Sequence, residues 1–137
     1  MTSLIEKKGT FEGEDLTRAA CKGEVSLLEL LLKEDSMKDL SDNYLTSALH
    51  CASRNGHLQA VKMLLSHGIN VNVQSASGET ALIKAVIGDH TEIAQFLIDK
   101  GADVNVIPRN GKTALLTAQV EGSDQMVQLL KKAGAIK

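Results

Sequence analysis

The segment Gly78–Asn105 reads GETALIKAVIGDHTEIAQFLIDKGADVN and holds one nearly complete copy of a repeating unit. Its hydroxyl, small, apolar and glycine positions recur 33 residues earlier and, in part, 33 residues later. The earlier matches are Ser47, Leu49, Ala52, His57, Leu64, Gly68 and Asn72; the later ones are Thr113, Leu115, Ala118, Leu130 and Gly134. A fixed period of this length is typical of a stacked repeat protein, in which each unit buries its apolar face against its neighbours.

The order of residues within a unit predicts two antiparallel helices joined by a tight corner. Thr80, like Ser47 and Thr113 in the neighbouring units, is a hydroxyl residue suited to cap the first helix. That helix is expected to stop near Asp89, at a corner where the backbone readily takes a positive φ. A second run carries apolar residues at helical spacing and ends at Gly101, an expected helix stop.

These motifs resemble those of the ankyrin repeat. The resemblance rests on Leu49-His50, on Gly56-His57 and on the exit sequence Gly101-Ala-Asp-Val-Asn105, and it covers roughly residues 14–136. It implies an all-α solenoid of stacked helix-turn-helix units with short hairpin loops and no central sheet. Seven or eight paired helices are expected, with five leucines buried between them: Leu49, Leu64, Leu82, Leu97 and Leu115. The resemblance also implies that Asn72 and Asn105 satisfy backbone groups of the hairpins.

Three departures from the family pattern leave its register intact. Alanine replaces the proline of the first motif in every unit, and the histidine of that motif is present only as His50. Asp89 stands at the corner where the neighbouring units have Gly56 and Gly122. If this corner requires a positive φ, Asp89 bears a steric cost that glycine avoids.

The repeat predicts one ankyrin-like domain, residues 14–137, behind a flexible N-terminal arm, residues 1–13. Its four units span about 12–44, 45–77, 78–110 and 111–137. The first and last units carry the features of caps, which need a polar outer face. In the last unit Gln119 and Lys131 occupy places that are expected to be buried in the other units. We therefore expect nothing to stack beyond them and the stack to be complete.

Composition narrows the function classes. The 137 residues include two phenylalanines, one tyrosine and no tryptophan, and the net charge is −2, so no overall basic charge attracts nucleic acid. No apolar run has the length of a membrane span, and the N-terminus lacks the apolar stretch of a secretory signal. A cytoplasmic protein is the expectation. Cys21 and Cys51 are then expected to be free thiols.

No set of residues predicts catalysis or a bound metal, so we expect neither an enzyme nor a cofactor. Gly111-Lys-Thr113 lacks the first glycine of a phosphate-binding loop and is better explained as the start of a repeat. A zinc site formed by His50, Cys51 and His57 is disfavoured because both histidines belong to repeat motifs. Glu92, Asp99 and Glu121 fall on separate helix faces and form no carboxylate pair.

A binding surface is the remaining prediction. In ankyrin-like stacks the partner contacts the concave side, formed by hairpin tips and inner-helix ends, so the resemblance implies a monomeric module that binds a protein, as an adaptor or a competitive inhibitor. The candidate contact residues are Asn43, Tyr44, Thr46, Arg54, Asn55, Ser77, Glu79, Ile87, Arg109, Asn110, Lys112, Val120 and Glu121. Tyr44, Ile87 and Val120 are expected to line one exposed strip. Arg54, Lys84, Arg109 and Lys112 form a small basic strip at most, which is too little charge for nucleic acid.

Three other functions stay open at this point. Asn72 and Asn105 each follow a leucine at −8, and Asp103-Val104-Asn105 resembles the sites of an oxygen-dependent asparaginyl hydroxylase of animal cells. A second alternative is a bacterial effector that acts on host proteins. An enzyme with a hidden site is the third and has the least support.

Overall fold

The computed structural model describes residues 13–33 and 42–136 and consists there of eight α-helices and no strand. The helices are α1 (Gly13–Lys22), α2 (Val25–Lys33), α3 (Asp42–Asn55), α4 (Leu58–Ser66), α5 (Ala81–Ile87), α6 (Thr91–Asp99), α7 (Ala114–Glu121) and α8 (Asp124–Lys132). The predicted all-α repeat fold is confirmed. None of these helices is long and apolar enough to cross a membrane.

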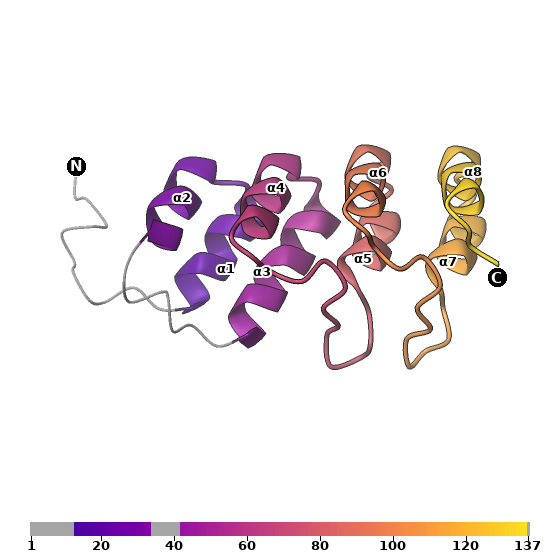
Figure 1. Ribbon diagram of the computed structural model, residues 1–137, viewed down its shortest axis with the longest axis horizontal. Coiled ribbons are helices and arrows are strands. Elements are labelled where there is room, and N and C mark those ends of the chain that lie inside the picture. Colours follow the sequence, from indigo (N-terminus) through magenta and orange to yellow (C-terminus); the bar gives the residue numbers. More distant parts are fainter. Residues whose placement is uncertain (1–12, 34–41, 137) are drawn as a thin grey trace.

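The helices form two rows. Figure 1 shows α2, α4, α6 and α8 in an outer row, with α1, α3, α5 and α7 in an inner row below it. Neighbouring inner helices contact one another more extensively than neighbouring outer helices do. The inner row is thus the more closely packed one, and we call its side the concave face. The loops before α5 and α7 project from it (Figure 1).

The core consists of leucines and alanines that repeat with the period of the sequence. Leu49, Leu64 and Leu97 are 0% exposed, Leu82 is 1% exposed and Leu115 is 4% exposed, so the predicted core leucines are confirmed. A row of fully buried alanines lies between the inner helices: Ala19, Ala52, Ala85 and Ala118. Because alanine has no side chain beyond Cβ, these positions allow the inner helices to approach closely.

Corners and caps follow the predicted chemistry in the last two units. Thr80 and Thr113 each accept a hydrogen bond on the side-chain oxygen from the third amide of the following helix, at 3.3 and 3.2 Å. The corner residues Gly56 and Gly122 have φ of 88° and 78°, and Asp89 has φ of 59°. Asp89 is the only non-glycine with positive φ in the described parts of the chain. The prediction for this corner is confirmed.

The second unit begins earlier than predicted. We expected Ser47 to cap its first helix, but α3 starts at Asp42 and Ser47 lies within it. The added turn packs on the first unit, where Thr17 donates a hydrogen bond to the Tyr44 carbonyl oxygen at 3.3 Å. The Tyr44 ring lies so close to buried Gly13 that a Cβ on this glycine would overlap it. The predicted arm, 1–13, otherwise lies outside the described residues; Gly13 itself begins α1.

The two cysteines are joined, which corrects the expectation of free thiols. Cys21 of α1 and Cys51 of α3 form a disulfide, with their Cα atoms 4.9 Å apart. Their separation of 30 residues is three less than the repeat period, so Cys21 lies about one helical turn beyond the place that matches Cys51. Adjacent inner helices bring the two positions together. We had expected free thiols because a cytoplasmic protein was expected, and that reasoning did not consider that the two cysteines lie on adjacent helices.

Asn72 and Asn105 connect successive units, which confirms their predicted structural role. Asn72 donates to the Gly101 carbonyl oxygen at 3.2 Å and accepts from the Asp103 amide at 2.7 Å. Asn105 repeats this arrangement, donating to Gly134 at 3.1 Å and accepting from the Ile136 amide at 3.0 Å. Each side chain thus satisfies backbone groups in the unit that follows its own.

Candidate functional site

Most predicted contact residues line two neighbouring clefts on the concave face. Cleft 2–3, between the second and third units, has a volume of about 570 Å³ and is lined by Asn43, Thr46, Ser47, His50, Cys51, Arg54, Gln74, Ser75, Ala76 and Lys84. Cleft 3–4, between the third and fourth units, has a volume of about 210 Å³ and is lined by Glu79, Ile87, Asn110, Lys112, Thr117, Val120 and Glu121. Nine of the 13 predicted residues fall in one cleft or the other.

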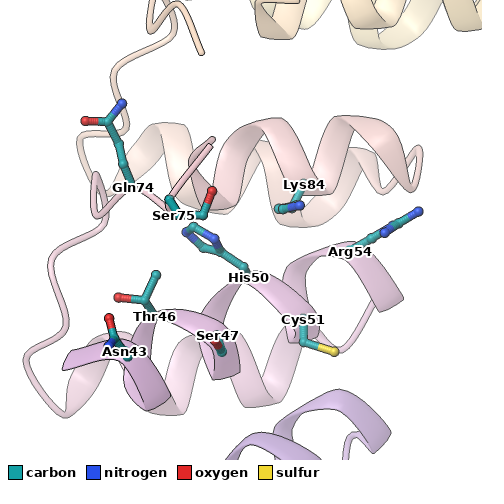
Figure 2. A pocket seen from close by; sticks show the side chains of 10 residues that line it. Asn43, Thr46, Ser47, His50, Cys51, Arg54, Gln74, Ser75 and Lys84 are labelled. Atoms are coloured by element: carbon teal, nitrogen blue, oxygen red, sulfur yellow. The ribbon is translucent and has the colours of Figure 1, made fainter. Parts of the chain in front are cut away.

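Cleft 2–3 is polar and contains no carboxylate among its lining residues. Figure 2 shows Arg54 and Lys84 at one end of the cleft, and Asn43 and Gln74 toward the other. The Gln74 amide donates to the Gly78 carbonyl oxygen at 2.9 Å, which links two residues of the same loop. Side chains of α3 and of this loop together line one open space.

The charges at the boundary between the clefts are paired. Lys84 Nζ lies 2.7 Å from Glu79 Oε1, and the two side chains are 21% and 14% exposed. The hydrogen bond from Lys84 lowers the pKa of Glu79 below its ordinary value, so this carboxylate stays ionised at neutral pH. Because Lys84 faces cleft 2–3 and Glu79 faces cleft 3–4, their ion pair forms the wall that separates them.

His50 lines cleft 2–3, and its imidazole carries no charge at neutral pH. Its Nε2 lies 3.0 Å from the Val73 carbonyl oxygen, and the side chain is 5% exposed. Burial lowers the pKa of His50, which keeps the imidazole neutral. The ring therefore donates to Val73, and the hydrogen bond attaches the loop to α3. Of the three basic side chains around the cleft, only Arg54 and Lys84 are cationic.

Cleft 3–4 combines an apolar surface with charged edges. Ile87 is half-buried and Val120 is 70% exposed, and they occupy matching places on α5 and α7, 33 residues apart. Lys112 stands among the polar residues around them, together with Glu79 and Glu121. The cleft therefore offers a small apolar contact within a polar rim, as binding surfaces do.

Four predicted contact residues line neither cleft. Tyr44 is 37% exposed, as predicted, but its ring lies close to Gly13 of the first unit, and the strip of Tyr44, Ile87 and Val120 stays a prediction. Asn43, Tyr44 and Thr46 lie in α3 instead of at a hairpin tip. Asn55 donates to the Cys21 carbonyl oxygen at 2.9 Å. Ser77 and Arg109 lie in adjacent loops, where the Arg109 amide donates to the Ser77 carbonyl oxygen at 2.9 Å.

The clefts also contain residues that the list of contacts omitted. Lys84 and Thr117 occupy the places that match Cys51, one and two periods later, a position that was not among the predicted contacts. Gln74 and Ser75 come from the loop, and no motif pointed to them. The suggested basic strip is divided, since Lys112 lines the other cleft and Arg109 lines neither.

The C-terminal end of the described stack is less polar than predicted. Gln119 and Lys131 are exposed there as expected, but Ile107, Leu116 and Ile136 are 72%, 40% and 76% exposed beside them. Together they line a groove of about 570 Å³. The polar character that we expected of a terminal cap is thus only partial.

The rejected chemical interpretations have structural explanations. Cys51 is bonded to Cys21 and therefore offers no thiolate for zinc. His50 contacts Val73, and the His57 ring lies against Gly23 of the first unit, so both rings act within the repeat framework. Thr113 caps α7, as the repeat interpretation of Gly111-Lys-Thr113 required.

Comparison with known proteins identifies the family. A model of ankyrin repeats in many copies matches residues 16–65 and 49–98, which together cover more than half of the chain. The chain belongs to the ankyrin repeat family. Ankyrin repeats are generally protein–protein interaction modules, and the family is generally non-catalytic.

Relatives share the repeat within much longer proteins. The chain is 33% identical over 73 residues to the potassium channel AKT2/3 of Arabidopsis thaliana, and 38% identical over 88 residues to the nuclear factor NF-kappa-B p105 subunit of Gallus gallus. These matches cover 53% and 61% of the chain but 9% of either relative. Ankyrin repeat domain-containing protein 29 of Danio rerio is 42% identical over 57 residues, which is 41% of the chain and 19% of the relative. The chain thus spans less than a fifth of these relatives.

Proposed function

We propose that this ankyrin repeat protein is a non-catalytic interaction module that binds a partner protein across clefts 2–3 and 3–4. The observation that carries the proposal is the convergence of varied side chains on one face. Leucine and alanine repeat in the core, while the matching concave positions hold Arg54, Ile87 and Val120 in successive units. Framework positions are constant and surface positions differ, as expected of a scaffold whose exposed residues select a partner.

The apolar content of cleft 3–4 supports the same proposal. Burial of apolar surface stabilises a complex by about 25 cal/mol per Å², and Val120 is 70% exposed. Ile87 lies beside it, with polar groups around both. A partner side chain placed between them would exclude water from an apolar contact at the centre of the interface.

The proposal also covers the extent of the domain, its oligomeric state and its location. The four units act as one domain, residues 14–137, and the module works as a monomeric adaptor or competitive inhibitor without a cofactor. A cytoplasmic site of action stays a prediction, and the Cys21–Cys51 disulfide bears against it, because disulfides persist mainly in oxidising compartments. No observation favours hydroxylation of Asn72 or Asn105, or a role as a bacterial effector, and both stay predictions.

The test is affinity capture with the intact chain as bait, from extracts of the cells that produce it. We expect Val120→Ser to weaken capture about tenfold, which corresponds to about 1.4 kcal/mol. Ile136→Ser is the matched control, because Ile136 is equally exposed but lies at the C-terminal end, outside both clefts. Thermal melting of both variants checks that the fold is retained.

Substitutions on the opposite face, formed by the outer helices, can contradict the proposal. Gln59 and Glu92 are exposed on the outer helices α4 and α6. If Gln59→Ala and Glu92→Ala reduce capture while Val120→Ser leaves it unchanged, the partner binds the convex side and the proposal is wrong.

A further inference from the structure

We infer that cleft 2–3 is a carboxylate-binding site, and that the partner is a protein segment that places an acidic side chain there and an apolar side chain in cleft 3–4. This inference rests on the proposed function and states the chemistry of its partner. It follows from the charges that remain unpaired, the donors around them and the distance between the clefts.

Arg54 is the unpaired charge. Its side chain is exposed, and within residues 13–33 and 43–136 no carboxylate lies within 4.0 Å of its guanidinium. The Lys84 ammonium is already paired with Glu79. The lining of cleft 2–3 therefore has a surplus positive charge at the end where Arg54 and Lys84 lie together (Figure 2).

The donors of this side chain suit a planar anion. A guanidinium has five N–H donors in a fixed plane and binds a carboxylate through two parallel hydrogen bonds. Farther along the cleft from Arg54, Ser47 and Thr46 add hydroxyl groups, and Asn43 adds an amide toward the other end (Figure 2). A carboxylate that enters the cleft meets donors and no competing acid among the lining residues.

The neighbouring cleft excludes a polyanion as the preferred ligand. A nucleic acid strand would require cations along its whole path. Cleft 3–4 instead presents Glu79 and Glu121, with Lys112 as its one cation and Ile87 and Val120 between them. One anionic group followed by one apolar group matches the two clefts, and a run of phosphates does not.

The spacing of the units sets the spacing of the two side chains. Packed helices lie about 8–10 Å apart, so the clefts are about one such step from each other. In a polyproline II segment, residues i and i+3 lie on one face and about 9 Å apart. The expected recognition sequence therefore has an acidic and an apolar residue three positions apart, in either order.

Titration with synthetic peptides tests this inference. The probes are short peptides that contain Glu-Pro-Pro-Leu or Leu-Pro-Pro-Glu, and matched peptides with Gln in place of Glu. We expect one of the two acidic peptides to bind at least about tenfold more tightly than its Gln counterpart. Arg54→Gln should abolish that preference. Lys132→Gln, which removes an equal charge from the outer helix α8, should preserve it.

Three results would overturn the inference. They are equal binding of the Glu and Gln peptides, a Glu preference that survives Arg54→Gln, and no saturable binding up to about 1 mM. Tighter, Arg54-dependent binding of a single-stranded oligonucleotide would assign the cleft to phosphate instead. Capture that depends on Val120 but not on Arg54 would leave the proposed function intact and reject only the acidic partner.

Discussion

The first two units and the last two units share one helical framework but are joined in different ways. Between the first and second, the Cys21–Cys51 disulfide and the lengthened helix α3 make the connection. Between the third and fourth, Asn105 bonds to the backbone of residues 134 and 136. The clefts differ as well, since cleft 2–3 is cationic and cleft 3–4 is partly apolar.

This difference shows which positions the repeat keeps constant and which positions can vary between units. Leucine at the centre of each unit and alanine between inner helices are required because neighbouring units pack at close range. Positions on the concave face touch no neighbouring unit in this way, and there the units differ in charge and polarity. We therefore expect core substitutions to have similar effects in different units and surface substitutions to have local ones.

The largest expected effect tests the shared framework. Leu64→Ala and Leu97→Ala should each lower the free energy of unfolding by about 2–5 kcal/mol, because both leucines are 0% exposed and each truncation leaves a cavity. Urea unfolding gives both values. If the two losses of stability agree to within about 1 kcal/mol, the second and third units have equivalent cores. A neutral result at either site would show that the unit containing it does not form the predicted core.

Reduction of the disulfide should destabilise the first two units and leave the last two nearly unchanged. A disulfide that closes a loop of about 30 residues lowers the entropy of the unfolded chain, which raises the free energy of unfolding by about 2–4 kcal/mol. Dithiothreitol should lower stability by that amount and speed hydrogen exchange in α1 and α2, with little change in α7 and α8. The double variant Cys21→Ser and Cys51→Ser is the control, since dithiothreitol should leave its stability unchanged. Two titratable thiols in the unreduced protein would refute the covalent link.

Asn105→Ala tests the connection at the other end. The substitution removes two hydrogen bonds to backbone groups, at a cost of about 1–2 kcal/mol given their exposure to water. Asn110→Ala is the control, because Asn110 accepts only from the Lys112 amide within its own loop in the described structure. Faster exchange of the Ile136 amide should accompany the loss. A cost no greater than that of the control would mean that water replaces both bonds.

The smallest effect concerns the corner in which the third unit differs from its neighbours. Asp89 has φ of 59° and is exposed, so glycine at this place removes a steric cost. Asp89→Gly should be neutral or stabilise by up to about 1 kcal/mol, even though glycine gains entropy in the unfolded chain. Thermal melting beside Asp89→Ala, which should destabilise, measures the difference. A clear loss in the glycine variant would reveal an interaction of the Asp89 carboxylate.

The features that were predictable from sequence are those determined within one unit or by the period. The buried leucines, the caps Thr80 and Thr113 and the positive φ of Asp89 follow from local preferences repeated in phase. The candidate surface was located through the same register, which is why Ile87 and Val120 lie together. Lys84 and Thr117 share one register position with Cys51, which the predicted contacts left out.

Most of the features that escaped prediction arise between units. Tyr44 was assigned to a hairpin tip because its position matches a loop in later units, yet it lies in the lengthened helix α3, with its ring close to Gly13 of the first unit. Cys21 and Cys51 meet because neighbouring helices are offset by about one turn. The division into two clefts depends on the Lys84–Glu79 pair, whose partners come from different sides of one unit. None of these contacts leaves a periodic mark on the sequence.

The central claim is that the partner lies along the concave face, across both clefts. Hydrogen–deuterium exchange of the chain, alone and with the partner recovered by capture, tests it most directly because it needs no substitution. We expect slower exchange upon binding in the two loops, residues 73–79 and 106–112, and at the ends of α3, α5 and α7 that border the clefts. Protection confined to the outer helices α4, α6 and α8 would contradict the account.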